Sequence, residues 1–214
     1  IELSGALAEL SRNTLKNEFR SIKPERAKIF LIEAGKSILT GFPQKLQLAA
    51  KKSMEELGII IKLNSKVTKI DKTSVKIENN GTSEIIESKV VLWAAGVKGN
   101  FAKSFLSNEN NIKFDKKGRV IVNRNLTIPN YEDIYVIGDF ASFSDEKNIP
   151  LPGTAPVAMQ EGTFVAKNIK GESEKDFKYY NKGSLTVIGR NAAVADFGKF
   201  QISGFFAWIL WVVV

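Results

Sequence analysis

The residues best able to do chemistry in this chain follow short apolar runs. Residues 28–33 form one such run, and it ends in the carboxylate of Glu33. A carboxylate at the end of a buried strand accepts hydrogen bonds from ribose hydroxyls in dinucleotide-binding units. It also repels a 2′-phosphate, which favours NADH over NADPH. The alternative interpretation of Glu33 is a solvated surface turn.

Two further runs end in small residues. Residues 89–94 lead into Ala95 and Gly96, where missing side chains would let a cofactor lie against the backbone. Residues 134–137 lead into Gly138 and Asp139. Asp139 would then lie at the carboxyl end of a parallel strand, where such sheets bind ligands, and could accept a hydrogen bond from a ribityl hydroxyl. The alternative interpretation is a plain loop at Ala95 and Gly96, and a simple turn at Gly138 and Asp139.

The stretch 150–160 runs from prolines and Gly153 into a predicted helix start. Free N–H groups and the positive end of the helix dipole would face a group lying beyond that end of the helix. Reduced flavin carries negative charge near N1 and O2, which such a terminus would stabilise. The alternative is an ordinary helix cap, with Gln160 as a surface side chain.

Composition narrows the chemistry further. The 214 residues include no Cys and no His, so thiolate chemistry, imidazole bases and metal sites built on either are excluded within this chain. Catalysis would use carboxylates, Lys, backbone dipoles or a bound cofactor. The net charge of +8 permits an anionic partner such as a membrane surface, a nucleic acid or a phosphorylated ligand. No aromatic–basic motif of a nucleic-acid module is present, so no nucleic-acid partner is expected.

Helices and strands alternate along the chain, which predicts α/β layers around these residues. Apolar spacing and turn signals predict helices at 1–10, 43–57 and 156–169, with a hairpin turn at Asn80 and Gly81. Strands are predicted at 28–33, 59–62, 66–71, 74–79, 85–87, 89–94, 118–123, 134–137, 185–188 and 193–197. Residues 28–33, 89–94 and 134–137 are expected to be buried strands.

Both ends suggest a segment of a longer protein. The first residue is Ile1, with no N-cap before the first predicted helix, and residues 205–214 are ten apolar residues without a polar stop. Ten residues are half of the roughly 20 that span a bilayer. With Trp208 and Trp211 in this run and a Lys-rich stretch before it, an interfacial membrane segment is predicted. A core strand or helix is the alternative.

Together these pieces resemble the type II NADH dehydrogenases, single-subunit FAD-dependent NADH:quinone oxidoreductases of the pyridine-nucleotide-dependent flavoproteins. The most discriminating stretches are Trp-Ala-Ala-Gly at 93–96 and Ala-Pro-Val-Ala-Met-Gln at 155–160. The resemblance covers essentially the whole chain, with matches at 1–10, 38–58, 91–97, 118–141, 151–169 and 183–214.

The resemblance implies two dinucleotide-binding, Rossmann-like domains, both incomplete here. Residues 1–97 would form most of the NADH domain, without its first strand and Gly-rich turn. Residues 98–171 would be the returning part of the FAD domain, and residues 172–214 the start of a membrane-anchoring region. The implied cofactors are FAD and NADH, and no metal is implied.

Residue roles follow from the same resemblance. Glu2 would lie near the nicotinamide, and Glu33 would hold the adenosine ribose. Ala95 and Gly96 would line the nicotinamide nucleotide site through their backbone, and Gly138 and Asp139 would contact the FAD ribityl chain. Beside the flavin ring would lie Ala158, Met159 and Gln160, with Gln160 facing the quinone. Many family members carry Gln at the position of Pro156, so Gln160 would bear more of that role.

The implied reaction transfers hydride from NADH to FAD and then two electrons to a membrane quinone. The implied partners are that quinone and a lipid bilayer surface, with the enzyme peripheral on the cytoplasmic face of the cytoplasmic membrane; a homodimer is also compatible. The segment alone is expected to be inactive. Two alternatives stay open: a soluble reductase of a disulfide or ferredoxin-like carrier, and a non-catalytic flavoprotein paralogue.

Overall fold

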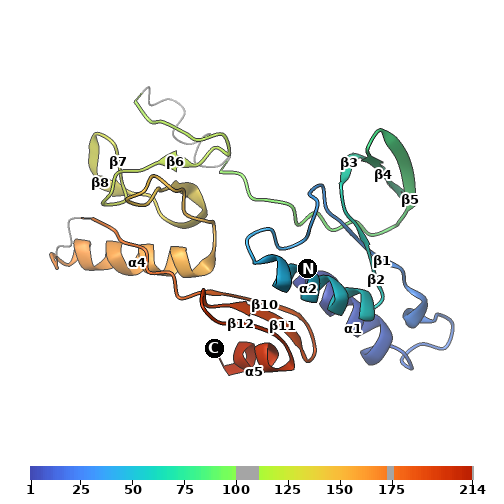
Figure 1. The fold of residues 1–214 in the computed structure, drawn as a ribbon. Helices are drawn as coiled ribbons and strands as arrows, with labels where there is room; N and C mark the ends of the chain where they lie inside the picture. Colours follow the sequence, from blue (N-terminus) through green and yellow to red (C-terminus); the bar gives the residue numbers. More distant parts are fainter. Residues whose placement is uncertain (100–110, 173–175, 214) are drawn as a thin grey trace. The chain divides into compact units, whose positions relative to one another are not determined.

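The computed structural model describes residues 1–99, 111–172 and 176–213 (Figure 1). Residues 100–110, within the predicted FAD-domain segment 98–171, therefore lie outside the described residues. The chain divides into two compact units, and each is described by itself. The first unit comprises residues 1–92 and 182–214, and the second comprises residues 93–181.

The first unit combines helical elements with three small sheets. Its helical elements are α1 (Glu2–Glu9), the π-helical turn η1 (Leu10–Thr14), the 3-10 turn η2 (Pro24–Arg26), α2 (Gln44–Glu56) and α5 (Phe205–Val213). Its strands are β1 (Ile29–Ile32), β2 (Ile59–Lys62), β3 (Ser65–Ile70), β4 (Ser74–Asn79), β5 (Thr82–Glu87), β10 (Ser184–Gly189), β11 (Ala192–Asp196) and β12 (Gln201–Gly204).

The sequence predicted one strand pairing of the first unit, the hairpin between β4 and β5. Strands β1 and β2 pair in parallel, whereas β3–β4–β5 and β10–β11–β12 are antiparallel sheets. The β4–β5 connection is the predicted tight hairpin, because Asn80 and Gly81 both have positive φ, 49° and 84°. Helix α2 begins after Pro43 and gives way to Gly58 at φ 70°, also as predicted.

The core of the first unit joins both ends of the chain. Leu46, Ala50 and Met54 project from one face of α2 at helical spacing and are buried with Ile188 of β10 and Val194 of β11. Strands β10 and β11, near the carboxyl end of the chain, are therefore part of this core.

Helix α1 lies directly against β10. A Cβ on Gly5 would lie 1.6 Å from the carbonyl oxygen of Ile188, so only glycine permits this approach. The β10–β11 turn is held to the same helix, because the backbone N–H of Arg190 donates to the Glu9 carboxylate. Its Asn191 adopts φ 63°.

The apolar stretch at the carboxyl end is a helix, α5, that packs on the β10–β12 sheet through the fully buried Ala207 (Figure 1). Phe206 and Val213 are about three-quarters exposed, at 73% and 78%. No helix in the described part of the chain is long and apolar enough to cross a bilayer.

The second unit is built from short strands and one long helix. Its elements are β6 (Val120–Ile121), β7 (Thr127–Ile128), β8 (Tyr131–Tyr135), the 3-10 turn η3 (Gly138–Phe140), β9 (Ala141–Ser142) and α4 (Ala155–Ile169). Helix α4 starts after Thr154, has Pro156 in its first turn and is followed by Gly171 at φ 78°, as predicted. Phe143, Phe164 and Phe177 form the centre of a core, with rings 5.3–5.5 Å apart in edge-on contacts.

Three strand predictions need correction. Residues 89–94 form no strand, because no described strand pairs with their backbone, and Val90 and Trp93 are exposed. Residues 134–137 are not a buried parallel strand: β8 ends at Tyr135, pairs antiparallel with β7, and leaves Ile134 exposed. The strand at 118–123 shrinks to the two residues of β6, whose parallel partner β9 is equally short.

Candidate functional site

The turn at Gly138 and Asp139 in the second unit is fixed by a residue of α4. The backbone N–H of Gly138, which has φ 65°, donates to Glu161 Oε2 at 2.5 Å. Asp139 follows with an exposed side chain. The sequence pattern identified the turn, but the prediction missed Glu161, because nothing in its local sequence shows that it bonds to a residue 23 positions away.

The surroundings of this turn are small residues. A Cβ on Gly153 would lie 3.0 Å from Asp139 Oδ1, and a Cβ on Gly138 would lie 3.5 Å from the Cβ of Ala158. The backbone around the Asp139 carboxylate is thus open to close approach. Thr154 makes no side-chain capping bond, which leaves the first turn of α4 without that partner for its N–H groups.

These features fit the ribityl and ring edge of a flavin. Ribityl hydroxyls would donate to the Asp139 carboxylate, and a helix N-terminus favours negative charge near it. Gly138, Asp139 and Ala158 belong to this one region, and Met159, the next residue of α4, has an exposed side chain. The fit rests on the open backbone and on the donor and acceptor types present.

Burial sets the electrostatics of this turn. Glu161 is only 2% exposed, and burial raises the pKa of its carboxyl above the ordinary value, with the nearby charge of Asp139 acting in the same direction. The hydrogen bond from Gly138 opposes this shift and lowers the pKa in part. The carboxyl that bonds this turn to α4 therefore holds its proton more tightly than an exposed Glu does.

Gln160 has a partner that the prediction did not foresee. Its Nε2 donates to the carbonyl oxygen of Tyr180 at 2.9 Å, and its Oε1 accepts from the Tyr180 N–H, also at 2.9 Å. Both ends of the amide are thus bonded to the backbone of one residue, much as in a strand pair. Gln160 also lines a hollow of ≈ 190 Å³ with Thr163, Phe164, Lys167, Phe177 and Lys178.

In the first unit, Glu33 lies directly after β1. Its backbone continues the strand pairing, because its N–H donates to Lys62 and its carbonyl accepts from Ser65. Its Oε1 accepts the N–H of Gly35 at 2.7 Å. This bond turns the carboxylate back toward the loop that follows the strand, and leaves the second oxygen, Oε2, without a hydrogen bond among the described residues.

Glu2 lies in the first turn of α1 and is exposed, where its charge is favourable at the positive end of the helix dipole. Ala95 and Gly96 lie in the exposed segment that starts the second unit, and Gly96 has φ 74°. The carbonyl oxygen of Ala95 accepts from the Trp93 indole at 3.1 Å. The predicted site residues thus fall into two groups, Glu2 and Glu33 in one unit and the rest in the other.

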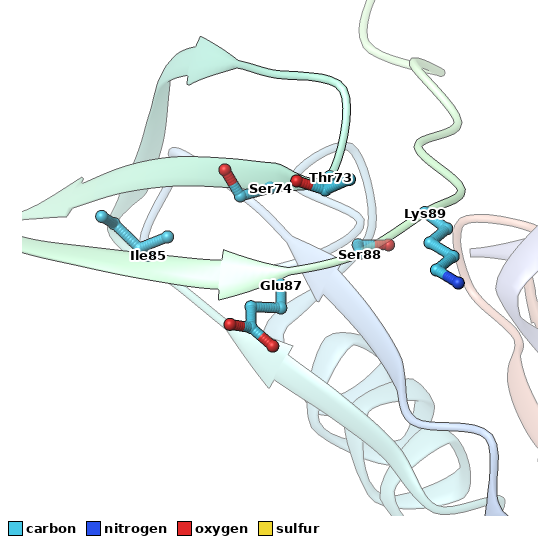
Figure 2. Close-up of a pocket in the computed structure, with 6 residues that line it drawn as sticks. All are labelled: Thr73, Ser74, Ile85, Glu87, Ser88 and Lys89. Atoms are coloured by element: carbon cyan, nitrogen blue, oxygen red, sulfur yellow. The ribbon is translucent and has the colours of Figure 1, made fainter.

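A second hollow, of ≈ 600 Å³, lies in the first unit beside the start of β4 and the end of β5, and Figure 2 shows the side chains that line it. It is lined by Thr73, Ser74, Ile85, Glu87, Ser88 and Lys89. None of the predicted site residues lines it. The described residues contain no cluster of carboxylates that could hold a metal ion.

Comparisons with known proteins identify the family and the relatives of this chain. The sequence model of the family described as pyridine nucleotide-disulphide oxidoreductase matches residues 1–162. A protein named type II NADH:quinone oxidoreductase Ndh, from Mycobacterium tuberculosis, is 34% identical over 222 residues, which cover 100% of this chain and 47% of that protein. The type II NADH:quinone oxidoreductase of Staphylococcus epidermidis is 34% identical over 179 residues, covering 81% of this chain and 43% of its own. The chain thus spans about half the length of these curated relatives.

Solved structures show the same fold. The NDH2 of Plasmodium falciparum, solved in complex with NADH, matches with a TM-score of 0.82 at 20% identity, covering 100% of this chain and 58% of that one. The sulfide:quinone oxidoreductase of Aquifex aeolicus matches with a TM-score of 0.66 at 15% identity, covering 99% and 52%. The predicted mixed α/β fold, similar to FAD- and NAD-binding Rossmann-type folds, is confirmed.

Proposed function

The chain belongs to the pyridine nucleotide-disulphide oxidoreductase family. From this premise we propose that it is part of an FAD-dependent NADH:quinone oxidoreductase. The observation that carries the proposal is the 34% identity to a type II NADH:quinone oxidoreductase along 100% of the chain. The proposed layout keeps residues 1–97 as the NADH domain, 98–171 as part of the FAD domain, and 172–214 as the start of the membrane-associating region.

In the first unit, the proposed role of Glu33 is to accept hydrogen bonds from the adenosine ribose of NADH. Gly35 fixes one carboxylate oxygen, and the other remains available to a hydroxyl. The negative charge disfavours a 2′-phosphate. Glu2, at the start of α1, is proposed to lie near the nicotinamide, and the backbone of Ala95 and Gly96 to line the same nucleotide.

In the second unit, Asp139 is proposed to bind the ribityl chain, with Gly138, Ala158 and Met159 around it. When bound, FAD supplies the hydride acceptor and the two-electron carrier. The amino end of α4 would stabilise negative charge on a group bound close to it. Gln160 can face a quinone only if its amide exchanges the Tyr180 backbone for the new partner.

A lipid surface is the second proposed partner, because α5 exposes Phe206 and Val213 while Ala207 holds the helix to its sheet. The enzyme would lie peripherally on the cytoplasmic face of the membrane, where the quinone is dissolved. Replacing Phe206 and Val213 with Ser should release the full-length protein from vesicles, whereas Ile85→Ser, at a similarly exposed site in β5, should not. Equal vesicle binding by the wild type and both variants would contradict the lipid contact.

The function is tested with the full-length protein loaded with FAD. We expect NADH oxidation that depends on added quinone and is much slower with NADPH. Electron transfer to a disulfide but not to quinone would support the soluble-reductase alternative instead, and absence of any turnover by a flavin-loaded protein would support the non-catalytic one.

Flavin content tests the assignment of Asp139. Asp139→Ala should lose FAD during purification, because the carboxylate that accepts from the ribityl chain is gone. Asp133→Ala, which removes another exposed carboxylate of the same unit, should keep it. Full flavin occupancy in both variants would contradict the role given to Asp139.

A further inference from the structure

Glu161 is the one charged side chain that is fully buried among the described residues. It is 2% exposed, and the other buried polar side chains there are the hydroxyls of Ser4, Ser65 and Thr127. A carboxylate in such a position lowers stability unless its partners compensate for lost hydration. A polar side chain buried at this position is therefore expected to serve a partner inside the protein, and that partner is the backbone N–H of Gly138.

The bond from Gly138 to Glu161 ties the turn to the helix. Gly138 lies at φ 65° and donates its N–H to Glu161 Oε2 at 2.5 Å. Without that acceptor, the donor would lose its partner inside the protein, which is costly. The helix α4 and the turn η3 are in contact, and this hydrogen bond links them.

Asp139 is the residue that this bond would place. It follows Gly138 directly, and its side chain lies beside Gly153, where a Cβ would come within 3.0 Å of Oδ1. Fixing the backbone of Gly138 therefore fixes the direction in which the next side chain leaves the turn. The charged group that acts on Glu161 from a neighbouring element is Asp139 itself, in η3.

We propose that Glu161 is a positioning residue of the FAD site: through the Gly138 N–H it holds the turn that presents the Asp139 carboxylate to the ribityl chain. This inference rests on the proposed function. Glu161 itself does not touch the cofactor in this scheme, and its contribution is acceptor geometry rather than charge.

The test measures the dissociation constant of FAD for the full-length protein, from the quenching of flavin fluorescence on titration of the apoprotein. Glu161→Met keeps the length of the side chain and removes the acceptor, and FAD should bind about tenfold more weakly. Glu161→Gln keeps an acceptor oxygen and should restore affinity to within about threefold of the wild type. If Glu161→Met does not fold, Glu161→Asp, which withdraws the acceptor by one methylene, should show the loss instead.

A control separates positioning from general loss of stability. Val165→Ala opens a cavity on the same helix, at a buried residue of the phenylalanine core, and should lower the melting temperature without changing the FAD constant. The proposal is overturned if the variants without an acceptor bind FAD like the wild type, if Glu161→Gln is as weak as they are, or if Val165→Ala weakens binding equally. A wild-type protein that binds no FAD would instead refute the proposed function itself.

Discussion

The two units hold the carboxylates that we propose to bind nucleotides, Glu33 and Asp139, in different ways. Glu33 is held locally, by strand pairing and by the N–H of a residue two positions further along. Asp139 lies in a turn that is fixed from a distance, because Glu161 comes from a helix 23 residues beyond Gly138. A site of the first kind is contained in a short stretch of sequence. A site of the second kind exists only when the tertiary fold has formed.

The largest loss of folding stability is expected at a long-range contact of the first unit, between α1 and β10, which lies outside the Glu33 loop. Gly→Ala within a helix ordinarily stabilises by about 1 kcal/mol. At Gly5 the new Cβ would meet the Ile188 carbonyl oxygen at 1.6 Å, so Gly5→Ala should instead cost about 3 kcal/mol. Chemical denaturation measures this loss.

Gly41→Ala is the matched control, since a Cβ there meets nothing within 4 Å. If Glu33 is held locally, the fraction of Gly5→Ala that remains folded should keep the preference for NADH over NADPH, which is proposed to depend on Glu33. A loss of that preference would show that the Glu33 loop depends on distant contacts too.

The Gln160–Tyr180 pair gives the next largest effect. Gln160→Leu removes two hydrogen bonds to the Tyr180 backbone and should cost about 1.5 kcal/mol. Hydrogen exchange of the Tyr180 amide should accelerate at the same time. Lys167→Gln, which alters the same hollow without touching Tyr180, should leave that amide protected. Unchanged exchange in Gln160→Leu would mean that the pair contributes nothing to holding residues 176–181.

Glu33→Ala should act on binding rather than on the fold. The KM for NADH should rise about tenfold, with a smaller fall in kcat, because the lost bonds are to a part of the nucleotide that does not react. Glu78→Ala, an exposed carboxylate of β4, serves as the control. Equal use of NADPH by the wild-type enzyme would count against the role of Glu33.

The smallest effect is one of pH. Burial raises the pKa of Glu161, so the protonated form is favoured in the folded state; the stability that this contributes is present at low pH and is lost as pH rises through the folded pKa. Glu161→Gln should therefore stabilise the protein by roughly 1 kcal/mol at pH 7.5 and by less at pH 4. Denaturant midpoints at the two pH values measure the difference. An equal increase in stability at both pH values would contradict the raised pKa of the Glu161 carboxyl.

Elements encoded by local sequence could be predicted, whereas elements that depend on distant contacts could not. Helices α1, α2 and α4, the Asn80–Gly81 hairpin and most strands of the first unit were predicted, because apolar spacing, Pro43 and Gly58 encode them locally, whereas β12 was not predicted. Residues 89–94 have the composition of a strand, but a strand also needs a neighbour to pair with, and composition does not supply one. The same limit explains β8, whose antiparallel partner determines where it ends.

The candidate site shows the limit at single residues. Glu33 and Asp139 could be predicted as candidates because a carboxylate after an apolar run is a local signal. Glu161 and Tyr180 were missed because their importance lies in bonds to Gly138 and Gln160 across 23 and 20 residues. Burial of an acidic residue on the apolar face of α4 was the only available signal, since Val157, Glu161, Phe164 and Val165 share that face.

The contact between α1 and β10 also bears on synthesis at the ribosome. Glu9 and Arg190 are 181 residues apart, so α1 and α2 leave the ribosome long before β10 and β11 arrive to cover them. The second unit, which is contiguous in sequence, leaves the ribosome during that interval. The first unit must wait with Leu46, Ala50 and Met54 uncovered, and a growing chain in that state is a natural client for a chaperone.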